Sequence, residues 1–221
     1  MQLPELMNVQ PNQSELLEEL ACMVGTCFRE EMWYATWLDA LDASEGRKLA
    51  ITQAAIRADY SVTAPLGCVH ALEDRSGAAN VFLRSELGSD TWAKLEERSE
   101  RLMAATLTPR EQAILGPRAE AMEPLSDTGW PFAFAREGED FLYFISIGVD
   151  PARRGSGAFG RLFKPFLAYA DEHGIRCYLD CYTDRLEQLY GHYGFRTAKR
   201  KTAPGFDLAE RLMIREPQAI G

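Results

Sequence analysis

The sequence lacks the cysteine and histidine patterns that bind structural metals. Its five cysteines are odd in number and form no pair of closely spaced pairs, and the chain holds only three histidines. Cys177 and Cys181 lie four residues apart in a predicted strand, where such a spacing places side chains on one face instead of around an ion. We therefore expect no metal site, and we expect reduced thiols in a cytoplasmic protein.

An excess of positive charge and long apolar segments are also missing. The formal net charge is −9, so the chain offers no broad cationic surface of the kind that nucleic acid needs. Residues 1–12 have neither the basic start nor the apolar run of a signal peptide, and no stretch is apolar for long enough to span a membrane. The sequence thus argues against nucleic-acid and membrane partners.

Helical patterns fill much of the first 125 residues. The predicted helical segments are 13–27, 31–41, 44–59 and 89–122. Ser44 is a suitable N-cap for the third of these segments. Thr108 and Glu111 have the spacing of a capping box, with Pro109 at the first helical position, so a new helix is expected to begin there.

Strand patterns occupy the middle and the end of the chain. The predicted strands are 60–63, 66–72, 79–84, 131–135, 141–149, 175–181, 195–199 and 207–215. Segments 141–149 and 175–181 are apolar on both faces, which is typical of strands in the middle of a sheet. A helix over 157–173, ended by Gly174, is predicted between them. These elements together predict a mixed α/β fold.

A turn rich in arginine and glycine joins the first of these buried strands to the helix that follows. It consists of Arg153, Arg154, Gly155, Ser156 and Gly157. The free N–H groups and the dipole at the start of a helix favour an anion, and glycine lets the backbone approach it closely. The arginines add positive charge. Such turns also occur without a phosphate, so this feature alone leaves both interpretations open.

The motif that begins in this turn resembles the cofactor signature of the GNAT superfamily of N-acetyltransferases. Arg154 and Gly157 occupy its first and fourth positions. Tyr190, Gly194 and Phe195 resemble the later Tyr-x-x-x-Gly-Phe signature of the same superfamily. The resemblance covers the last part of the chain closely and the first 135 residues only in outline.

The resemblance implies one GNAT-like domain over residues 1–221, of the α/β (α+β) class. The implied sheet is mixed, mostly antiparallel and twisted, is flanked by helices, and has a splayed central pair of parallel strands. Residues 85–130 would form a helical insertion before the cofactor strand. Residues 141–215 would form the cofactor-binding and C-terminal half.

The resemblance also implies acetyl-coenzyme A as co-substrate. The backbone of Ile147 and Val149 would pair with its pantetheine arm, and the N–H groups from Arg154 to Phe159 would hold its pyrophosphate. The residues expected to bind it are Ile147, Val149, Arg153, Arg154, Gly155, Ser156, Gly157, Ala158 and Phe159. Phe159 stands where the family has glycine or alanine, and its ring either crowds the pyrophosphate or turns into the core.

In the family the substrate amine attacks the thioester directly, so two proton transfers are needed. By resemblance, Tyr190 is the acid that protonates the departing thiolate, and its structural alternative is a core tyrosine at a helix end. Asp180, near the end of the second buried strand, is our candidate base. Its alternatives are a helix cap or an ion pair with Arg185, and a water chain could also take the proton.

The leading prediction is an acetyl-coenzyme A-dependent N-acetyltransferase acting on a primary amine of a small molecule. The outline is similar to the branch that includes puromycin acetyltransferase. A coenzyme A-binding sensor or structural domain without turnover, and a protein or peptide N-acetyltransferase, stay open as alternatives. Four aromatic residues are candidates either for lining the acceptor pocket or for packing helices: Trp92, Trp130, Phe132 and Phe134. The sequence leaves open the acceptor and the assembly, a homodimer included.

Overall fold

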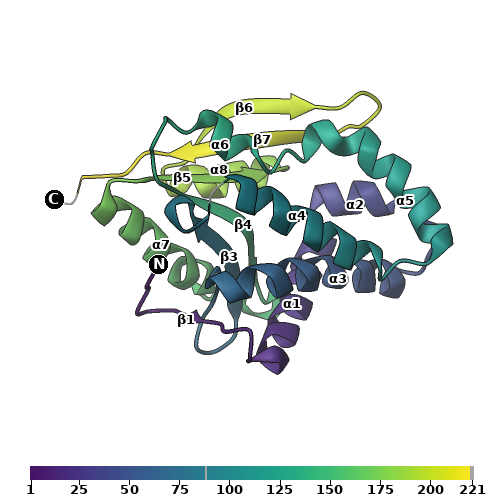
Figure 1. The fold of residues 1–221 in the computed structure, drawn as a ribbon, viewed down its shortest axis with the longest axis horizontal. Coiled ribbons are helices and arrows are strands. Elements are labelled where there is room, and N and C mark those ends of the chain that lie inside the picture. The colour runs from purple at the N-terminus through teal and green to yellow at the C-terminus, as the bar shows by residue number, and fades with distance from the viewer. Residues whose placement is uncertain (88, 220–221) are drawn as a thin grey trace.

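A seven-stranded sheet in the order β1-β2-β3-β4-β5-β7-β6 forms the centre of the molecule (Figure 1). The computed structural model describes residues 1–87 and 89–219. Its strands are β1 (Met7–Asn8), β2 (Val69–Ala71), β3 (Gly77–Leu83), β4 (Phe141–Val149), β5 (Arg176–Cys181), β6 (Arg196–Thr202) and β7 (Ala209–Arg215). β4 and β5 run parallel, and the other neighbouring pairs are antiparallel.

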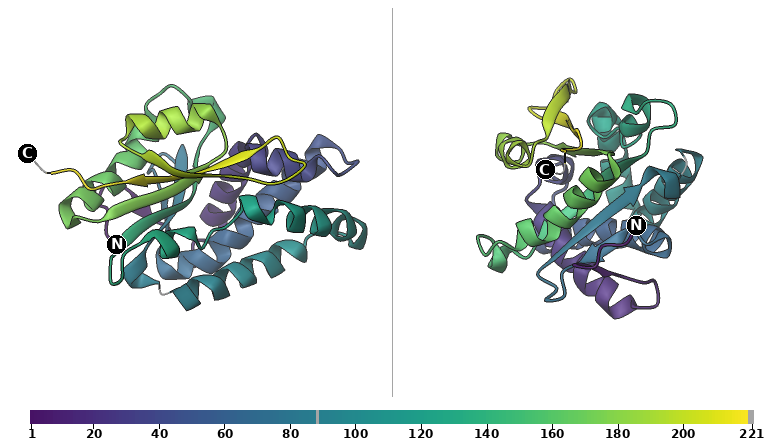
Figure 2. Two further views of the ribbon diagram at one scale, coloured as in Figure 1. Left: turned by 90° about the horizontal axis from the view of Figure 1, so that it is seen from above. Right: turned by 90° about the vertical axis from the view of Figure 1, so that its left-hand side faces the viewer.

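Helices cover both faces of the sheet. They are α1 (Ser14–Arg29), α2 (Met32–Leu38), α3 (Glu45–Thr63), α4 (Ser89–Ala104), α5 (Pro109–Met122), α6 (Trp130–Phe134), α7 (Ala158–His173) and α8 (Asp184–His192). α7 and α8 pack on one face, and α1 and α3 pack on the other, as Figure 2 shows from two further directions. None of the helices within the described residues has the length and apolarity needed to cross a bilayer.

Alternation along β4 sends its side chains to these two layers. Leu142 and Phe144 pack toward α7, together with Phe166. Phe141 and Tyr143 face the opposite way, into an aromatic cluster with Trp130 and Tyr178. Because both faces of β4 are covered, its sequence is apolar at nearly every position, as a central strand requires.

The parallel pair comes apart after a short paired segment. Phe141, Leu142 and Tyr143 lie opposite Arg176, Cys177 and Tyr178, and the pairing ends there. β4 then follows β3, while β5 follows β7. The β3–β4 register passes from Phe144 to Ser146, which makes Ile145 the extra residue of a bulge and bends the strand. The predicted splayed pair in a mostly antiparallel sheet is confirmed.

The prediction of a strand over 60–63 was wrong, because these residues continue α3. Tyr60 extends the buried stripe of Ile56 and Ala64 against α1, and this packing outweighs the strand preference of the β-branched residues beside it. The prediction over 131–135 was also wrong. Pro131 occupies the first turn of α6, where its fixed φ suits a helix.

Two further features differ from the sequence-based expectation. The strand predicted over 66–72 is confined to β2, because Ala64–Leu66 form a 3-10 turn that ends at Gly67 with a φ of 71°. No sequence pattern indicated β1, which is two residues long. The prediction that a new helix begins within the 89–122 segment is confirmed, with the capping box of Thr108 and Glu111 at the start of α5.

Candidate functional site

The turn between β4 and α7 presents open backbone to solvent. The Asp150 carboxylate accepts a hydrogen bond from the Ala152 N–H at 2.9 Å, and the Ser156 hydroxyl donates to the Arg153 carbonyl at 2.7 Å. Gly155 and Gly157 have φ values of 81° and 82°, and a Cβ added at either would meet no atom within 4 Å. The turn is therefore held in shape from within, while the space outside its glycines is free for a ligand.

The first turn of α7 supplies free donors beside these glycines. The Arg161 N–H donates to the Gly157 carbonyl at 3.1 Å as the first bond of the helix. The N–H groups of Ala158, Phe159 and Gly160 precede it and have no acceptor within the helix. Together with the helix dipole, they form a seat that fits a pyrophosphate.

The two arginines of the turn differ in how their charges are used. Arg154 donates to Glu30 at the end of α1 at 3.0 Å. Both side chains are largely exposed, at 42% and 64%, so solvent screens this pair and a bound anion can compete for Arg154. Arg153 is exposed and forms no ion pair within the part of the chain that the structure describes. Of the two arginines, Arg153 is therefore the one whose charge is not already paired with a carboxylate of the described residues.

Phe159 turns into the core, which is one of the two orientations left open by the sequence. Its ring centroid lies 5.1 Å from that of Phe163, 5.7 Å from Tyr193 and 6.2 Å from Tyr190. The ring therefore fills the contact between α7 and α8. This explains how a large residue fits at a position where the family has a small one.

Ile147 and Val149 lie on the part of β4 that has left β5. Their side chains pack toward α7, and within the described residues this segment pairs only with β3. The backbone edge on the β5 side is therefore available to an extended ligand. The carbonyl of Val149 accepts a hydrogen bond from the Cys27 thiol at 3.2 Å, which ties the end of α1 to the end of β4.

Tyr190 approaches the opening from the α7 side of the sheet. It is 8% exposed and belongs to the same core cluster as Leu179 and Cys181 of β5. Burial raises the pKa of Tyr190 well above its usual value, with the nearby Cys181 and Asp180 as further causes. The phenol therefore keeps its proton at neutral pH. Its body has the packing of a core tyrosine, which does not conflict with a donor role for its hydroxyl.

Asp180 lies on the opposite face. The Tyr143 hydroxyl donates to its Oδ1 at 2.9 Å, and α8 is capped by Thr183 instead. The helix-cap alternative for Asp180 is therefore wrong. Burial raises the pKa of Asp180 to about 6, although the hydrogen bond from Tyr143 favours the ionised form. A carboxylate with this pKa can accept a proton near neutral pH.

The structure adds two carboxylates that the sequence analysis did not identify. Glu31 caps α2 by accepting from the Trp33 N–H at 2.8 Å, and its other oxygen is buried without a partner. Burial raises the pKa of Glu31 to about 7, and the charge of Asp180 adds to this shift. Burial likewise raises the pKa of Glu210 on β7 to about 8, with Asp180 as a further cause.

A local signal for Glu210 was present in the sequence. Glu210 and Leu212 are two apart in β7, so they share a face, and Leu212 belongs to the aromatic cluster of Tyr143. A glutamate at an inward position of an alternating strand marks a buried charge. Glu31 gave no such signal, because it lies in the short connection between α1 and α2 and only tertiary packing buries it.

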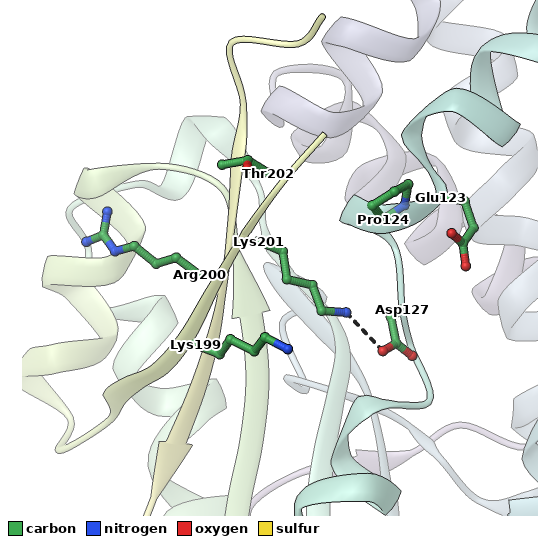
Figure 3. Close-up of a pocket in the computed structure, with 7 residues that line it drawn as sticks. All are labelled: Glu123, Pro124, Asp127, Lys199, Arg200, Lys201 and Thr202. Carbon is green, nitrogen blue, oxygen red and sulfur yellow. Dashed lines mark hydrogen bonds and ion pairs between the residues drawn. The ribbon is translucent and has the colours of Figure 1, made fainter. Parts of the chain in front are cut away.

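A groove of about 390 Å³ runs between β6 and the loop that follows α5 (Figure 3). The Lys201 ammonium crosses it to Asp127 at 2.9 Å and lies 3.8 Å from Glu210. Its charge lowers the pKa values of Asp180 and Glu210 against the larger effect of burial. Lys201, on β6, thus supplies a positive charge close to Asp127 and Glu210.

Four other side chains that could take part in chemistry are buried in the core: His70, Cys181, Trp92 and Trp130. Burial lowers the pKa of His70 to about 4, and its ring contacts the Cys68 carbonyl at 3.2 Å. Burial raises the pKa of Cys181 to about 12, so it stays a thiol. Trp92 and Trp130 are buried in the aromatic cluster beside Tyr143, whereas Phe134 is 39% exposed. Across residues 1–87 and 89–219, no three His, Cys, Asp or Glu side chains are placed to hold a metal ion.

No protein-family model and no curated protein matches this sequence. Solved structures do match. An N-acetyltransferase from Staphylococcus aureus Mu50 has a TM-score of 0.54 at 16% identity, over 95% of this chain and 98% of that one. A GNAT family acetyltransferase from Listeria monocytogenes 4b F2365 has a TM-score of 0.51 at 14% identity, over 96% and 93%. Another acetyltransferase has a TM-score of 0.54 at 15% identity, over 96% and 99%. This chain has the fold of the GNAT acetyltransferases.

Proposed function

We propose that this protein is an acetyl-coenzyme A-dependent N-acetyltransferase, formed by a single domain, whose acceptor is a primary amine of a small molecule. One arrangement carries the proposal. The sheet opens after Tyr143 beside the free donors of α7, and Tyr190 and Asp180 approach this opening from opposite faces. A phenol that keeps its proton and a carboxylate that can accept one are what acetyl transfer to an amine requires.

The residues beside the opening fit acetyl-coenzyme A, which would supply an activated acetyl thioester. The turn glycines and the α7 N–H groups match a pyrophosphate, with Arg153 as a counter-charge. The free edge of β4 at Ile147 and Val149 matches the amides of an extended arm. Each of these groups belongs to a rigid element, so the seat is formed before a ligand arrives.

In this proposal Asp180 removes the proton from the substrate amine, on its own face of the sheet. An alkylamine with a pKa of about 10.4 arrives protonated at neutral pH, and only the neutral amine is a nucleophile. The ionised Asp180 accepts that proton, while Tyr143 keeps the carboxylate oriented through its hydrogen bond. Glu31, buried and close enough to influence Asp180, adds negative charge that attracts the cationic acceptor.

Tyr190 supplies the proton for the departing thiolate, on the other face of the sheet. Its raised pKa means that the phenol is protonated at neutral pH, so it can donate a hydrogen bond to the negative charge that develops on the departing sulfur and can supply the proton that the sulfur gains. The acid and the base are thus separated by the sheet, so the proton that Asp180 takes is not the one that Tyr190 gives. Two separate proton carriers fit direct attack by the amine on the thioester, in which the amine loses a proton and the departing sulfur gains one.

The surroundings of Asp180 favour a small acceptor over a peptide. α6 lies over this face through Trp130, which packs against Tyr143 and Tyr178 with ring centroids 6.4 Å and 5.3 Å away. α2 and α5 form a further apolar cluster with the β6–β7 connection. Helices and loops thus cover the region on these sides, which restricts the size of an acceptor that can reach Asp180.

A thiol-release assay with acetyl-coenzyme A over a panel of small amines tests the proposal. We expect release above background with at least one amine, and at least a hundredfold loss in the Asp180→Asn variant. Thiol release that stays at background for every amine, despite measurable coenzyme binding, would identify a binding domain without turnover. Absence of both binding and release would reject the proposal altogether.

A further inference from the structure

A second cavity lies on the face of the sheet that carries Asp180, between β3, β4, α3 and α4. Its volume is about 90 Å³, enough for an aminoalkyl group or a few water molecules. The residues of its lining that matter here are Asp59, Asn80, Trp92, Glu96, Ser99 and Ile145. The roles proposed above for the glycine-rich turn and for Asp180 do not account for this cavity.

Polar groups in the wall of the cavity have no protein partner. Asn80 is fully buried, and neither its amide nitrogen nor its amide oxygen makes a hydrogen bond. The indole N–H of Trp92, a residue that is 6% exposed, is likewise unpaired. A buried amide without partners destabilises the folded state, so this wall is suited to a polar ligand that would pair with it.

The charge of the wall is negative. Asp59 comes from α3 and Glu96 from α4, and the Ser99 hydroxyl donates to Asp59. Burial raises the pKa of Glu96 to about 7 and that of Asp59 to about 6, and Glu100 adds to both shifts. The charge of Asp127 also raises the pKa of Glu96. Among the described residues the lining includes no lysine or arginine. A ligand that balanced the charge of the two carboxylates would therefore be a cation.

The remaining walls indicate an organic cation. Trp92, Ile145 and Leu95 give the cavity apolar sides that suit methylene groups. No metal-binding arrangement of carboxylates occurs among the described residues. An ammonium on an alkyl chain meets both requirements, since its head pairs with the carboxylates and its chain packs on the aromatic and aliphatic walls.

The cavity lies next to the position of acetyl transfer. Ile145 is the bulged residue of β4, two residues beyond Tyr143. The Trp92 ring centroid is 6.2 Å from that of Tyr143, whose hydroxyl holds Asp180 at 2.9 Å. Two aromatic rings, those of Trp92 and Tyr143, thus link the wall of the cavity to the candidate base, and an acceptor that reaches both places must run alongside these rings.

We propose that the acceptor is an alkyl diamine or polyamine, and that its second ammonium sits in this cavity between Asp59 and Glu96, with Asn80 as a hydrogen-bond partner. The inference rests on the proposed function, because it names the acceptor class of the same site. The reacting amine lies at Asp180, and the distal ammonium sets specificity. Asp59, Glu96 and Asn80 are therefore positioning residues that act on affinity more than on turnover.

The test compares diamines of three to eight carbons with the monoamine that has the same chain length. We expect kcat/KM for the best diamine to exceed that of its monoamine at least tenfold. Glu96→Gln should reduce this preference at least tenfold, mainly through the KM for the diamine. Glu97→Gln is the matched control, because Glu97 carries the same charge one residue along α4, is 64% exposed and pairs with Arg101.

A binding measurement tests the diamine site separately from the proposed acetyltransferase activity. Calorimetric titration of the best diamine into the full-length protein, without coenzyme, should show binding that Glu96→Gln weakens at least tenfold and Glu97→Gln does not. Equal turnover of diamines and monoamines would overturn the inference and leave the acetyltransferase proposal standing. If no amine were acetylated, diamine binding that Glu96→Gln weakens would still support the cavity, and absence of binding would show that it holds water only.

Discussion

The Tyr143 hydroxyl donates a hydrogen bond to Oδ1 of Asp180 at 2.9 Å, just beyond the last paired residues of the parallel strands. Tyr143 belongs to β4 and Asp180 to β5, so the bond spans the two strands at the point where they begin to separate. It orients the carboxylate on the face opposite Tyr190. It also favours the ionised form of a group whose pKa burial raises to about 6.

This bond gives the activity a defined pH dependence. If Asp180 acts as the base, kcat/KM should rise as pH increases through about 6, because only the carboxylate accepts a proton. Tyr143→Phe removes a hydrogen bond that lowers the pKa of Asp180, so the midpoint should move to higher pH. Initial rates from pH 5 to 9 measure both effects. A midpoint that stays in place in the variant would contradict the role of Asp180.

Tyr190→Phe should lower kcat about a hundredfold, because it removes a proton donor while it keeps the ring that packs against Phe163. The affinity for coenzyme A, measured by calorimetry, should not change. Tyr193→Phe is the control, because this tyrosine packs against the same phenylalanine, at a centroid distance of 5.1 Å, without a proposed role. Equal losses in the two variants would indicate damage to packing and not the loss of an acid.

Gly157→Asp should abolish coenzyme binding, because it places a carboxylate where the pyrophosphate would lie and strains a φ of 82°. Gly174→Asp is matched to it: this glycine ends the same helix with a φ of 63°, and an added Cβ there also meets nothing within 4 Å. The control carries the same charge and a similar strain away from the turn. Retained affinity in Gly157→Asp would place the pyrophosphate elsewhere.

Glu210→Gln should stabilise the protein at high pH. Burial raises the pKa of Glu210 to about 8, so the folded state holds a proton there that the unfolded state releases above about 4.5. The wild-type carboxyl therefore costs nothing at pH 4 and destabilises the fold increasingly as pH rises toward 9. We expect the variant to match wild type at pH 4 and to be more stable at pH 9, by up to about 5 kcal/mol for a pKa shift from 4.5 to about 8.

Urea unfolding at both pH values measures this difference. Glu120→Gln is the control, because Glu120 is exposed and the same substitution there should change stability little at either pH. A Glu210→Gln variant that is less stable than wild type at pH 9 would show that the Lys201 ion pair outweighs the cost of burying the carboxylate.

Several local features follow from the sequence because short-range chemistry decides them. The left-handed glycines at 155 and 157, the capping box at Thr108 and the unpaired donors at the start of α7 need no information from distant residues. The apolar segment of β4 likewise predicts a central strand, because only burial on both faces explains its composition.

Sequence-based predictions fail where burial depends on partners far along the chain. Tyr60 is helical because α1 packs against the apolar side of α3 that carries it. The strand preference of the neighbouring residues gives no information about that contact. Glu31 becomes a buried carboxylate near Asp180 although 149 positions separate them in the sequence. The orphaned amide of Asn80 depends on how α3 and α4 close over β3.

By itself, then, the sequence determined the mixed α/β fold and the glycine-rich turn before α7. Its resemblance to a family marked Tyr190, and the end of a buried strand marked Asp180, because motifs and strand patterns are local along the chain. Only the tertiary structure decided that Tyr190 and Asp180 lie on opposite faces of an opened sheet, and that Asp59, Glu96 and Asn80 share a cavity. Burial and the resulting pKa shifts arise from residues that meet only in the folded protein, and spacing along the chain does not encode them.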